Sequence, residues 1–355
     1  MTIWILSFTD RGALTAGEIA AAFPDEDVRT DRFSSLDISL REYADRAFSE
    51  SDALVFVGAC GIAVRAIAPF IRSKMTDPAV LAVDEAAHYV IPILSGHIGG
   101  ANALARRISS VIGAEAVITT ATDIRGAFAV DLFAKKNLLT ILDPGGIKEV
   151  SSAILAGDMI GLFCELPMEP ELPRELLPDE PERMNLVIPD TRRGNPASLR
   201  TMIERAEAGG TAKTGMMVLL PKRAVLGVGC RKGASFAEVK AGACQALRLA
   251  GTDRRELAAV ASLDRKKEEN ALKRLCAEWG LPFLVYTPEQ LRQIPGDFAA
   301  SEFVRDTAGV GNVCGRASHA GALSFGSAAR TLLPKTIIGG AAFAVAEFTR
   351  KPIRF

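Results

Sequence analysis

Short apolar runs alternate with segments of helical period along the first part of the chain. Apolar runs typical of buried strands cover 3–8, 53–57, 90–94 and 116–119. Segments whose apolar positions recur at the helical period cover 14–23, 62–72, 101–111 and 126–136. This alternation predicts a mainly parallel sheet with helices on its faces.

The pattern changes after 142–146, and a stretch rich in proline and acidic residues follows at 165–181. That composition excludes a helix or a central strand and predicts a long loop in a small middle domain. Alternation returns near Arg223 and gives a second α/β pattern. The sequence therefore predicts an α/β protein with mainly parallel sheets and flanking helices, in three domains that cover 1–136, 137–222 and 223–355.

The composition argues against several classes of binding partner. The chain has 355 residues, of which 48% are hydrophobic, and its 42 Lys and Arg balance its 42 Asp and Glu. No global basic field exists to attract nucleic acid or an anionic membrane, so neither is an expected partner. The six cysteines form no C-x-x-C pair, and we expect no metal site. No apolar run reaches the length of a membrane span and no signal peptide is recognisable, so we expect a cytoplasmic enzyme.

The most informative local string is Leu-Ser-Gly-His-Ile-Gly-Gly-Ala-Asn at 94–102, where a predicted strand ends and a predicted helix begins. Glycines at Gly96, Gly99 and Gly100 permit a tight turn, and the helix N-terminus offers amide donors to a ligand carboxylate. His97 is a candidate general base or acid near neutral pH. The alternative is that the glycines only turn the chain and that the histidine caps or packs.

A second glycine-containing string at 58–65 also joins a strand to a helix, so we expect its loop at the same sheet edge. Arg65 and Lys74 suit the binding of substrate carboxylates, and the alternative makes them part of a solvated face. The string Thr-Thr-Ala-Thr-Asp at 119–123 ends the next strand, and Asp123 lies either at this edge or at the cap of the following helix.

In the third domain, a glycine-containing turn at 227–233 invites comparison with nucleotide-binding loops. Lys232 stands where a dinucleotide motif has its third glycine, and no P-loop string is present, so the nucleotide interpretation is weak. Arg231 and Lys232 still form a candidate anion cradle. We expect His319 to pack or to form local hydrogen bonds.

These strings together resemble the cobalt-precorrin-5A hydrolases of anaerobic cobalamin biosynthesis. The resemblance is densest over 56–131 and is most specific at 95–102; in the third domain it rests on 226–231, 262–264 and 309–314. It spans essentially the whole chain, although the middle domain carries no matched motif. One departure is Gly315, which stands where the family leads us to expect an acidic residue.

The resemblance implies a cobalt-bearing tetrapyrrole substrate whose lactone is opened by water and from which acetaldehyde is expelled. Cobalt arrives in the substrate, so no cofactor is expected. We expect His97 to activate water or to carry a proton, Asp84 or Asp123 to orient it, and amides around Gly99 and Gly100 to stabilise an oxyanion. Substrate contacts, in a cleft between domains, are expected from Gly58, Gly61, Arg65, Lys74, Ser95, Gly96, Gly99, Gly100, Asn102, Gly229, Arg231 and Lys232.

Two alternatives to this hydrolase stay open at this point. A protein that binds and delivers a corrinoid intermediate predicts tight binding without chemistry. A nucleotide-dependent enzyme predicts thermal stabilisation by ATP or NAD. A homodimer and transient contacts with other enzymes of cobalamin biosynthesis are also open.

Overall fold

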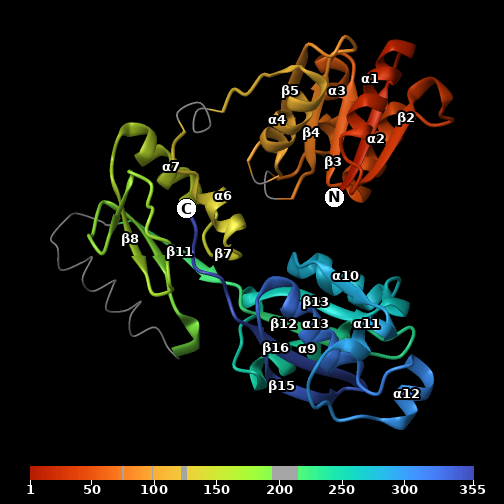
Figure 1. The fold of residues 1–355 in the computed structure, drawn as a ribbon, viewed down its shortest axis with the longest axis vertical. Helices are drawn as coiled ribbons and strands as arrows, with labels where there is room; N and C mark the ends of the chain where they lie inside the picture. The colour runs from red at the N-terminus through yellow and green to blue at the C-terminus, as the bar shows by residue number, and fades with distance from the viewer. Residues whose placement is uncertain (74–75, 98, 121–125, 194–214) are drawn as a thin grey trace. The chain divides into compact units, whose positions relative to one another are not determined.

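The computed structural model describes residues 1–355 except 74–75, 98, 121–125 and 194–214. It contains three mixed, mostly parallel β-sheets with flanking helices (Figure 1). The chain divides into two compact units, Met1–Leu132 and Phe133–Phe355, and each is described by itself. The expected α/β class, with mainly parallel sheets and flanking helices, is therefore confirmed, whereas the expected domain boundaries stay predictions.

The first unit is built on a six-stranded sheet of order β2-β1-β3-β4-β5-β6. Its strands are β1 (Thr2–Ser7), β2 (Asp27–Arg32), β3 (Ala53–Val57), β4 (Ala79–Val83), β5 (Tyr89–Leu94) and β6 (Glu115–Ala116). Its helices are α1 (Asp10–Ala21), α2 (Leu40–Glu50), α3 (Cys60–Ile67), α4 (Ala101–Ile112) and the start of α6 (Val130–Lys136). β1 to β4 are parallel, β5 is antiparallel to β4, and β6 is parallel to β5.

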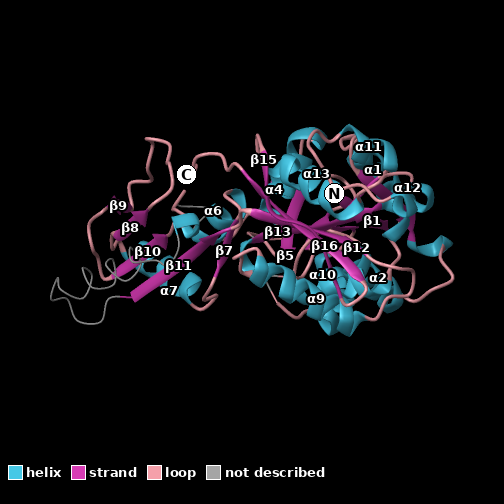
Figure 2. Cartoon of the chain, turned by 90° about the horizontal axis from the view of Figure 1, so that it is seen from below, coloured by secondary structure: helices cyan, strands magenta, loops and turns pink. Residues whose placement is uncertain are grey.

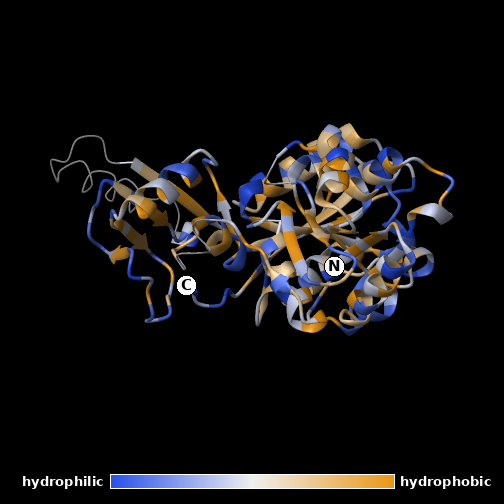
Figure 3. Cartoon of the chain, turned by 90° about the horizontal axis from the view of Figure 1, so that it is seen from above, coloured by the Kyte–Doolittle hydropathy of each residue, from blue (hydrophilic) through white to orange (hydrophobic). Residues whose placement is uncertain are grey.

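Helices cover both faces of this sheet because alternate strand residues are apolar on each side. On one face Ile3, Ile5 and Val55 pack with α1 and α4. On the other face Leu54 and Phe56 pack with α2 and α3. Figure 2 shows the helices in cyan around strands in magenta, and the strands are mostly coloured hydrophobic in Figure 3.

The second unit contains two five-stranded sheets. The first has the order β7-β11-β10-β8-β9, from β7 (Leu139–Ile141), β8 (Ile160–Cys164), β9 (Leu176–Pro178), β10 (Met184–Ile188) and β11 (Gly215–Pro221), with α7 (Gly146–Ala156). β8 to β11 are parallel and β7 is antiparallel to β11. The proline-rich stretch forms a loop that contains only β9, a short edge strand, as its composition requires.

The last sheet has the order β14-β13-β12-β16-β15. Its strands are β12 (Ala224–Gly229), β13 (Leu257–Leu263), β14 (Phe283–Tyr286), β15 (Ala329–Ile338) and β16 (Ala341–Phe348). Its helices are α9 (Phe236–Leu249), α10 (Asn270–Trp279), α11 (Pro288–Gln293), α12 (Glu302–Ala308) and α13 (Val313–Phe325). α9 and α10 cover one face, and α11 and α13 cover the other.

Gly227 explains how closely α13 approaches this sheet. A Cβ at Gly227 would lie 1.9 Å from the carbonyl oxygen of Cys314 and 2.9 Å from the backbone N of Ser318, so no side chain fits between strand and helix. The first glycine of the 227–233 string therefore lies inside β12 and serves packing.

We predict that Gly227→Ala destabilises the second unit by about 3 kcal/mol, the upper end of the usual cost of overpacking, because backbone atoms must move. Gly17→Ala, in α1 with nothing near its Cβ position, is the control and should change stability by less than about 1 kcal/mol. Urea unfolding followed by circular dichroism measures both. A Gly227→Ala protein as stable as its parent contradicts the close approach of α13.

Several predicted elements differ from the observed ones. The strand expected at 116–119 is only β6, and the helices expected at 62–72 and 126–136 are shorter, since α3 ends at Ile67 and α6 begins at Val130. In the first unit, the elements that were not predicted are β2, α2 and β4. No helix in the described ranges is long and apolar enough to cross a bilayer.

Candidate functional site

The loop that carries His97 is a compact turn between β5 and α4. The first two amides of α4 are used within it: Ala101 N–H donates to the Ser95 carbonyl at 3.1 Å, and Asn102 N–H to the Gly96 carbonyl at 3.0 Å. Gly100 N–H donates to the His97 carbonyl at 2.9 Å. The Gly100 amide is therefore already bonded, contrary to the expectation that it faces an oxyanion.

Two glycines of this loop are required by close contacts. A Cβ at Gly99 would lie 2.3 Å from Ser95 Cβ and 2.8 Å from the Ser95 carbonyl oxygen. A Cβ at Gly96 would lie 2.9 Å from Asn102 Oδ1. Asn102 is buried, and its Nδ2 donates to Thr120 Oγ1 at 2.9 Å, so this side chain ties the loop to the segment after β6.

His97 lies beside Asp131, from the first turn of α6. Nδ1 of His97 is 3.5 Å from Oδ1 of Asp131, and the side chains are 17% and 9% exposed. Burial alone would raise the pKa of Asp131, but the His97 hydrogen bond and charge and the Leu132 N–H lower it below its ordinary value. The carboxylate is therefore ionised at neutral pH and able to orient the imidazole. Sequence reasoning missed Asp131.

Ser95 combines backbone strain with an unpaired hydroxyl. Its φ is +58°, in the left-handed region that non-glycine residues adopt at a cost of about 1–2 kcal/mol. Its Oγ is buried and has no hydrogen-bond partner within the described ranges. The hydroxyl is shielded from solvent in this loop conformation, so a role for Ser95 in substrate binding stays a prediction.

We predict that Ser95→Gly raises the free energy of unfolding by about 1 kcal/mol by relieving the left-handed strain. Ser95→Ala keeps the strain and removes only the hydroxyl, so its stability should stay near that of the parent. If the hydroxyl contacts substrate, both variants lose activity equally. A loss confined to Ser95→Gly would instead indicate that a rigid loop backbone is what matters.

The expectation that the 58–65 and 94–102 loops share a sheet edge is wrong. Because β5 is antiparallel to β4, Leu94 pairs with Val80, where β4 begins, and Val90 pairs with Val83, where it ends. The Gly58 amide donates to the Val83 carbonyl at 2.8 Å, at the other end of β4. The two loops therefore lie at opposite edges of the sheet.

Asp84 follows the end of β4, so it lies at the opposite edge of the sheet from His97. Its carboxylate accepts the N–H groups of Ala86, His88 and Tyr89 at 2.6–3.0 Å and shapes the turn between β4 and β5. The hypothesis that Asp84 orients His97 is therefore wrong. Asp123, the other candidate for that role, and Lys74 lie outside the described residues.

The 58–65 loop occupies the carboxyl ends of β1 and β3, between which the strand order of the sheet reverses. Ligands of open α/β sheets bind at such switch points. Gly58 lies against the Phe8 ring, and Arg65 is exposed, with Nη1 donating to the Gly61 carbonyl at 3.2 Å. This edge is a second candidate surface, separate from His97.

The 229–233 turn of the third domain already holds a carboxylate of the protein. Gly229 ends β12, and the Gly233 amide donates to Glu269 Oε1 and Oε2 at 3.1 and 3.2 Å. Lys266 pairs with Glu269 at 3.4 Å. Because the Gly233 amide is bonded to Glu269, it is not available to an anionic ligand. Arg231 and Lys232 are exposed on the turn.

His319 forms local hydrogen bonds, as predicted. Nδ1 lies 3.0 Å from the Gly315 carbonyl and must donate to it, so Nε2 accepts from Thr331 Oγ1 at 3.2 Å. Burial lowers the pKa of His319, which keeps the ring neutral. Gly315 lies in the first turn of α13, and its amide donates to Asn312 Oδ1 at 2.8 Å.

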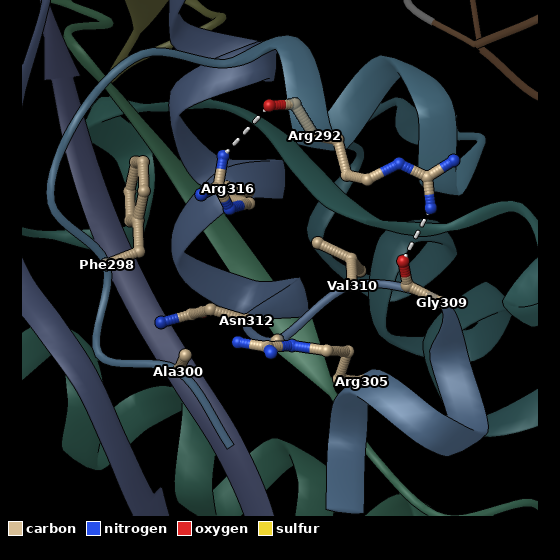
Figure 4. Close-up of a pocket in the computed structure, with 9 residues that line it drawn as sticks. Arg292, Phe298, Ala300, Arg305, Gly309, Val310, Asn312 and Arg316 are labelled. Carbon is tan, nitrogen blue, oxygen red and sulfur yellow. Dashed lines mark hydrogen bonds between the residues drawn. The ribbon is translucent and has the colours of Figure 1, made fainter. Parts of the chain in front are cut away.

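A pocket of about 400 Å³ in the third domain was not predicted. Three arginines from separate elements line it, Arg292, Arg305 and Arg316, together with the 309–312 loop (Figure 4). In the part of the chain that the structure describes, no group of three or more His, Cys, Asp or Glu residues is placed to hold a metal ion.

Comparison with protein families gives three matches in chain order. They are Cobalamin synthesis G N-terminal at 42–123, Cobalamin biosynthesis central region at 128–198 and Cobalamin synthesis G C-terminus at 224–346. A cobalt-precorrin-5A hydrolase from Salmonella typhimurium is 33% identical over 328 residues, which cover 89% of this chain and 91% of that protein. A cobalt-precorrin-5A hydrolase from Priestia megaterium is 28% identical and covers 72% of this chain and 69% of that protein.

Among solved structures, a cobalamin biosynthesis protein G homologue from Sulfolobus solfataricus covers 98% of this chain and 97% of its own, at 19% identity and a TM-score of 0.43.

Proposed function

Since this chain belongs to the cobalamin synthesis G family, we propose that it is a cobalt-precorrin-5A hydrolase whose chemistry centres on His97 and Asp131. The observation that carries the site is the 3.5 Å approach of His97 Nδ1 to an ionised, largely buried carboxylate. A carboxylate in this position fixes the tautomer that leaves Nε2 as a base. Ser95, two positions before His97, stays a predicted substrate contact.

The proposed reaction begins with water at the lactone carbonyl. His97 Nε2 takes a proton from the water as its oxygen bonds to the carbonyl carbon. Collapse of the tetrahedral intermediate breaks the bond between the acyl carbon and the ring oxygen, which frees a carboxylic acid arm and leaves a hydroxyl on the departing carbon. Loss of the hydroxyl proton then breaks the carbon–carbon bond to the macrocycle, releases acetaldehyde and leaves a ring carbon that takes a proton.

Cobalt enters this scheme as part of the substrate, and no further cofactor is needed for either bond cleavage. Three exposed cations suit substrate carboxylates: Arg65, Arg231 and Lys232. They belong to two different units, and binding of one substrate by both units stays a prediction. A cytoplasmic location, a homodimer and transient contacts with other pathway enzymes also stay predictions.

Anaerobic incubation with enzymatically prepared cobalt-precorrin-5A tests the proposal directly. Acetaldehyde is followed through the oxidation of NADH by alcohol dehydrogenase, with boiled protein as the blank. Acetaldehyde release that scales with protein concentration supports the hydrolase. Tight binding of the substrate without acetaldehyde would contradict it and would favour a binding or delivery protein.

A further inference from the structure

The three arginines of the third domain surround a pocket that no aspartate or glutamate lines. They come from the end of α11, from α12 and from the first turn of α13, and Figure 4 shows their side chains around the cavity. Its volume of about 400 Å³ falls in the range of pockets that hold small molecules. The wall is therefore cationic, although the chain as a whole carries no net charge.

Two of these arginines are held in place by the protein. Arg316 Nη1 donates to the carbonyls of Leu291 and Ile294 at 3.1 and 2.8 Å, and its guanidinium lies 4.8 Å from the centre of the Phe298 ring. Arg292 Nη1 donates to the Gly309 carbonyl at 2.7 Å. Fixed guanidinium groups bind an anion with little further loss of side-chain entropy.

The positive charge of the pocket is only partly neutralised. Arg292 pairs with Glu289 at 2.6 Å. Arg305 and Arg316 pair with no carboxylate of the described residues, so three guanidinium charges face one carboxylate. Like charges gathered around one cavity repel, and a bound anion would offset that repulsion.

The loop at 309–312 adds polar backbone to the same wall. Asn312 caps α13, so the positive end of a 13-residue helix dipole lies at the pocket. Within the described ranges the N–H groups of Gly311 and Asn312 have no acceptor. Amide donors beside guanidinium groups suit a carboxylate, and the Phe298 ring suits the methylene groups next to it.

We propose that this arginine pocket binds carboxylate arms of a polycarboxylate ligand, and that Arg305 is its most available charge. These arms are the acetate and propionate side chains of the tetrapyrrole substrate, an identification that rests on the proposed function. The pocket then acts as a handle on the periphery of the macrocycle and takes no part in bond cleavage.

Fluorescence titration of uroporphyrin III, a tetrapyrrole with acetate and propionate arms, tests the pocket on the full chain. Arg305→Gln should weaken binding by about tenfold, because one charged hydrogen-bonding partner is lost, and Arg305→Glu should weaken it further. Arg248→Gln and Arg248→Glu are matched controls, since Arg248 is exposed on α9 across the sheet, and each should bind within about twofold of the parent. Added salt should weaken binding less in the Arg305 variants than in the parent.

Competition distinguishes carboxylate from phosphate. Tricarballylate should displace uroporphyrin III at a lower concentration than inorganic phosphate does. Unchanged affinity of both Arg305 variants, no saturable binding by the parent, or stronger competition by phosphate would overturn the inference. If the parent releases acetaldehyde but both Arg305 variants bind uroporphyrin III as tightly as the parent does, only the pocket assignment is overturned. If binding depends on Arg305 but the parent releases no acetaldehyde from cobalt-precorrin-5A, only the proposed function is overturned.

Discussion

Replacement of His97 by alanine should lower the rate of acetaldehyde release by at least about a hundredfold, because a positioned acid or base contributes that much or more. His97 is 17% exposed and lies beside Asp131, in a loop where the amides of 100–102 are bonded within the turn. The imidazole is therefore the group placed to take a proton from water. The measurement is the initial rate in the coupled assay at saturating substrate.

His88→Ala is the matched control for this variant. His88 lies on the turn between β4 and β5, its side chain is 70% exposed, and its ring nitrogen is 3.7 Å from Asp84. It repeats the histidine–aspartate pairing at the opposite edge of the same sheet, so its loss should leave the rate within about twofold. Equal losses in both variants, or full activity of His97→Ala, would move the chemistry away from this loop.

Asp131→Asn should lower the rate less than His97→Ala, since the base remains and only its orientation is lost. The stability that the Asp131 carboxylate contributes has a defined pH dependence. Because its folded pKa lies below the ordinary value, the contribution is full above about pH 4 and is lost as the pH falls through the folded pKa. The part of the stability difference between parent and Asp131→Asn that depends on the ionised carboxylate should therefore shrink in strong acid.

The sequence predicted the class of the fold because strands buried on both faces are continuous apolar runs. β3 was predicted over the residues it occupies, 53–57. β2 was not, because its sequence Asp-Val-Arg-Thr-Asp-Arg has one apolar side chain and it lies at a sheet edge. β4 was overlooked although 79–83 is wholly apolar.

Because β4 was not predicted, the direction of β5 and the sheet edge that carries His97 were predicted wrongly. Only the residues 84–88 separate β4 from β5, too few for a crossover between parallel strands. Two apolar runs with so short a connection indicate an antiparallel pair, which places His97 at the edge where β3 and β4 begin. This signal was present in the sequence and would have separated His97 from Asp84.

Asp131 and the arginine pocket had no comparable local signal. Asp131 lies 34 positions beyond His97, and its place depends on how the chain returns after β6. Arg292, Arg305 and Arg316 stand on three elements, and each read alone is an ordinary surface arginine. Only tertiary packing brings them to one cavity.

Arg223→Met should destabilise the second unit by about 3–5 kcal/mol, the usual cost of removing one partner from a buried ion-pair group. Arg223 is 8% exposed at the start of β12; its Nε lies 2.8 Å from Glu256 Oε1 and its Nη1 lies 2.9 Å from Glu347 Oε1. Burial alone would lower the pKa of Arg223, but the hydrogen bonds and charges of Glu256 and Glu347 raise it. Without the guanidinium, two buried carboxylates lose their shared partner, although Glu347 keeps Arg330 at 2.6 Å.

Urea unfolding of the full chain measures this effect, and the variant Arg223→Met/Glu256→Gln/Glu347→Gln separates its causes. Removal of all three charges should recover much of the lost stability, because the cost comes from unpaired buried charge rather than from the missing side chain. Arg248→Gln, at an exposed position, should stay within about 0.5 kcal/mol of the parent. If Arg223→Met alone costs less than about 1 kcal/mol, water reaches the two carboxylates and apolar packing is what chiefly stabilises this end of the sheet.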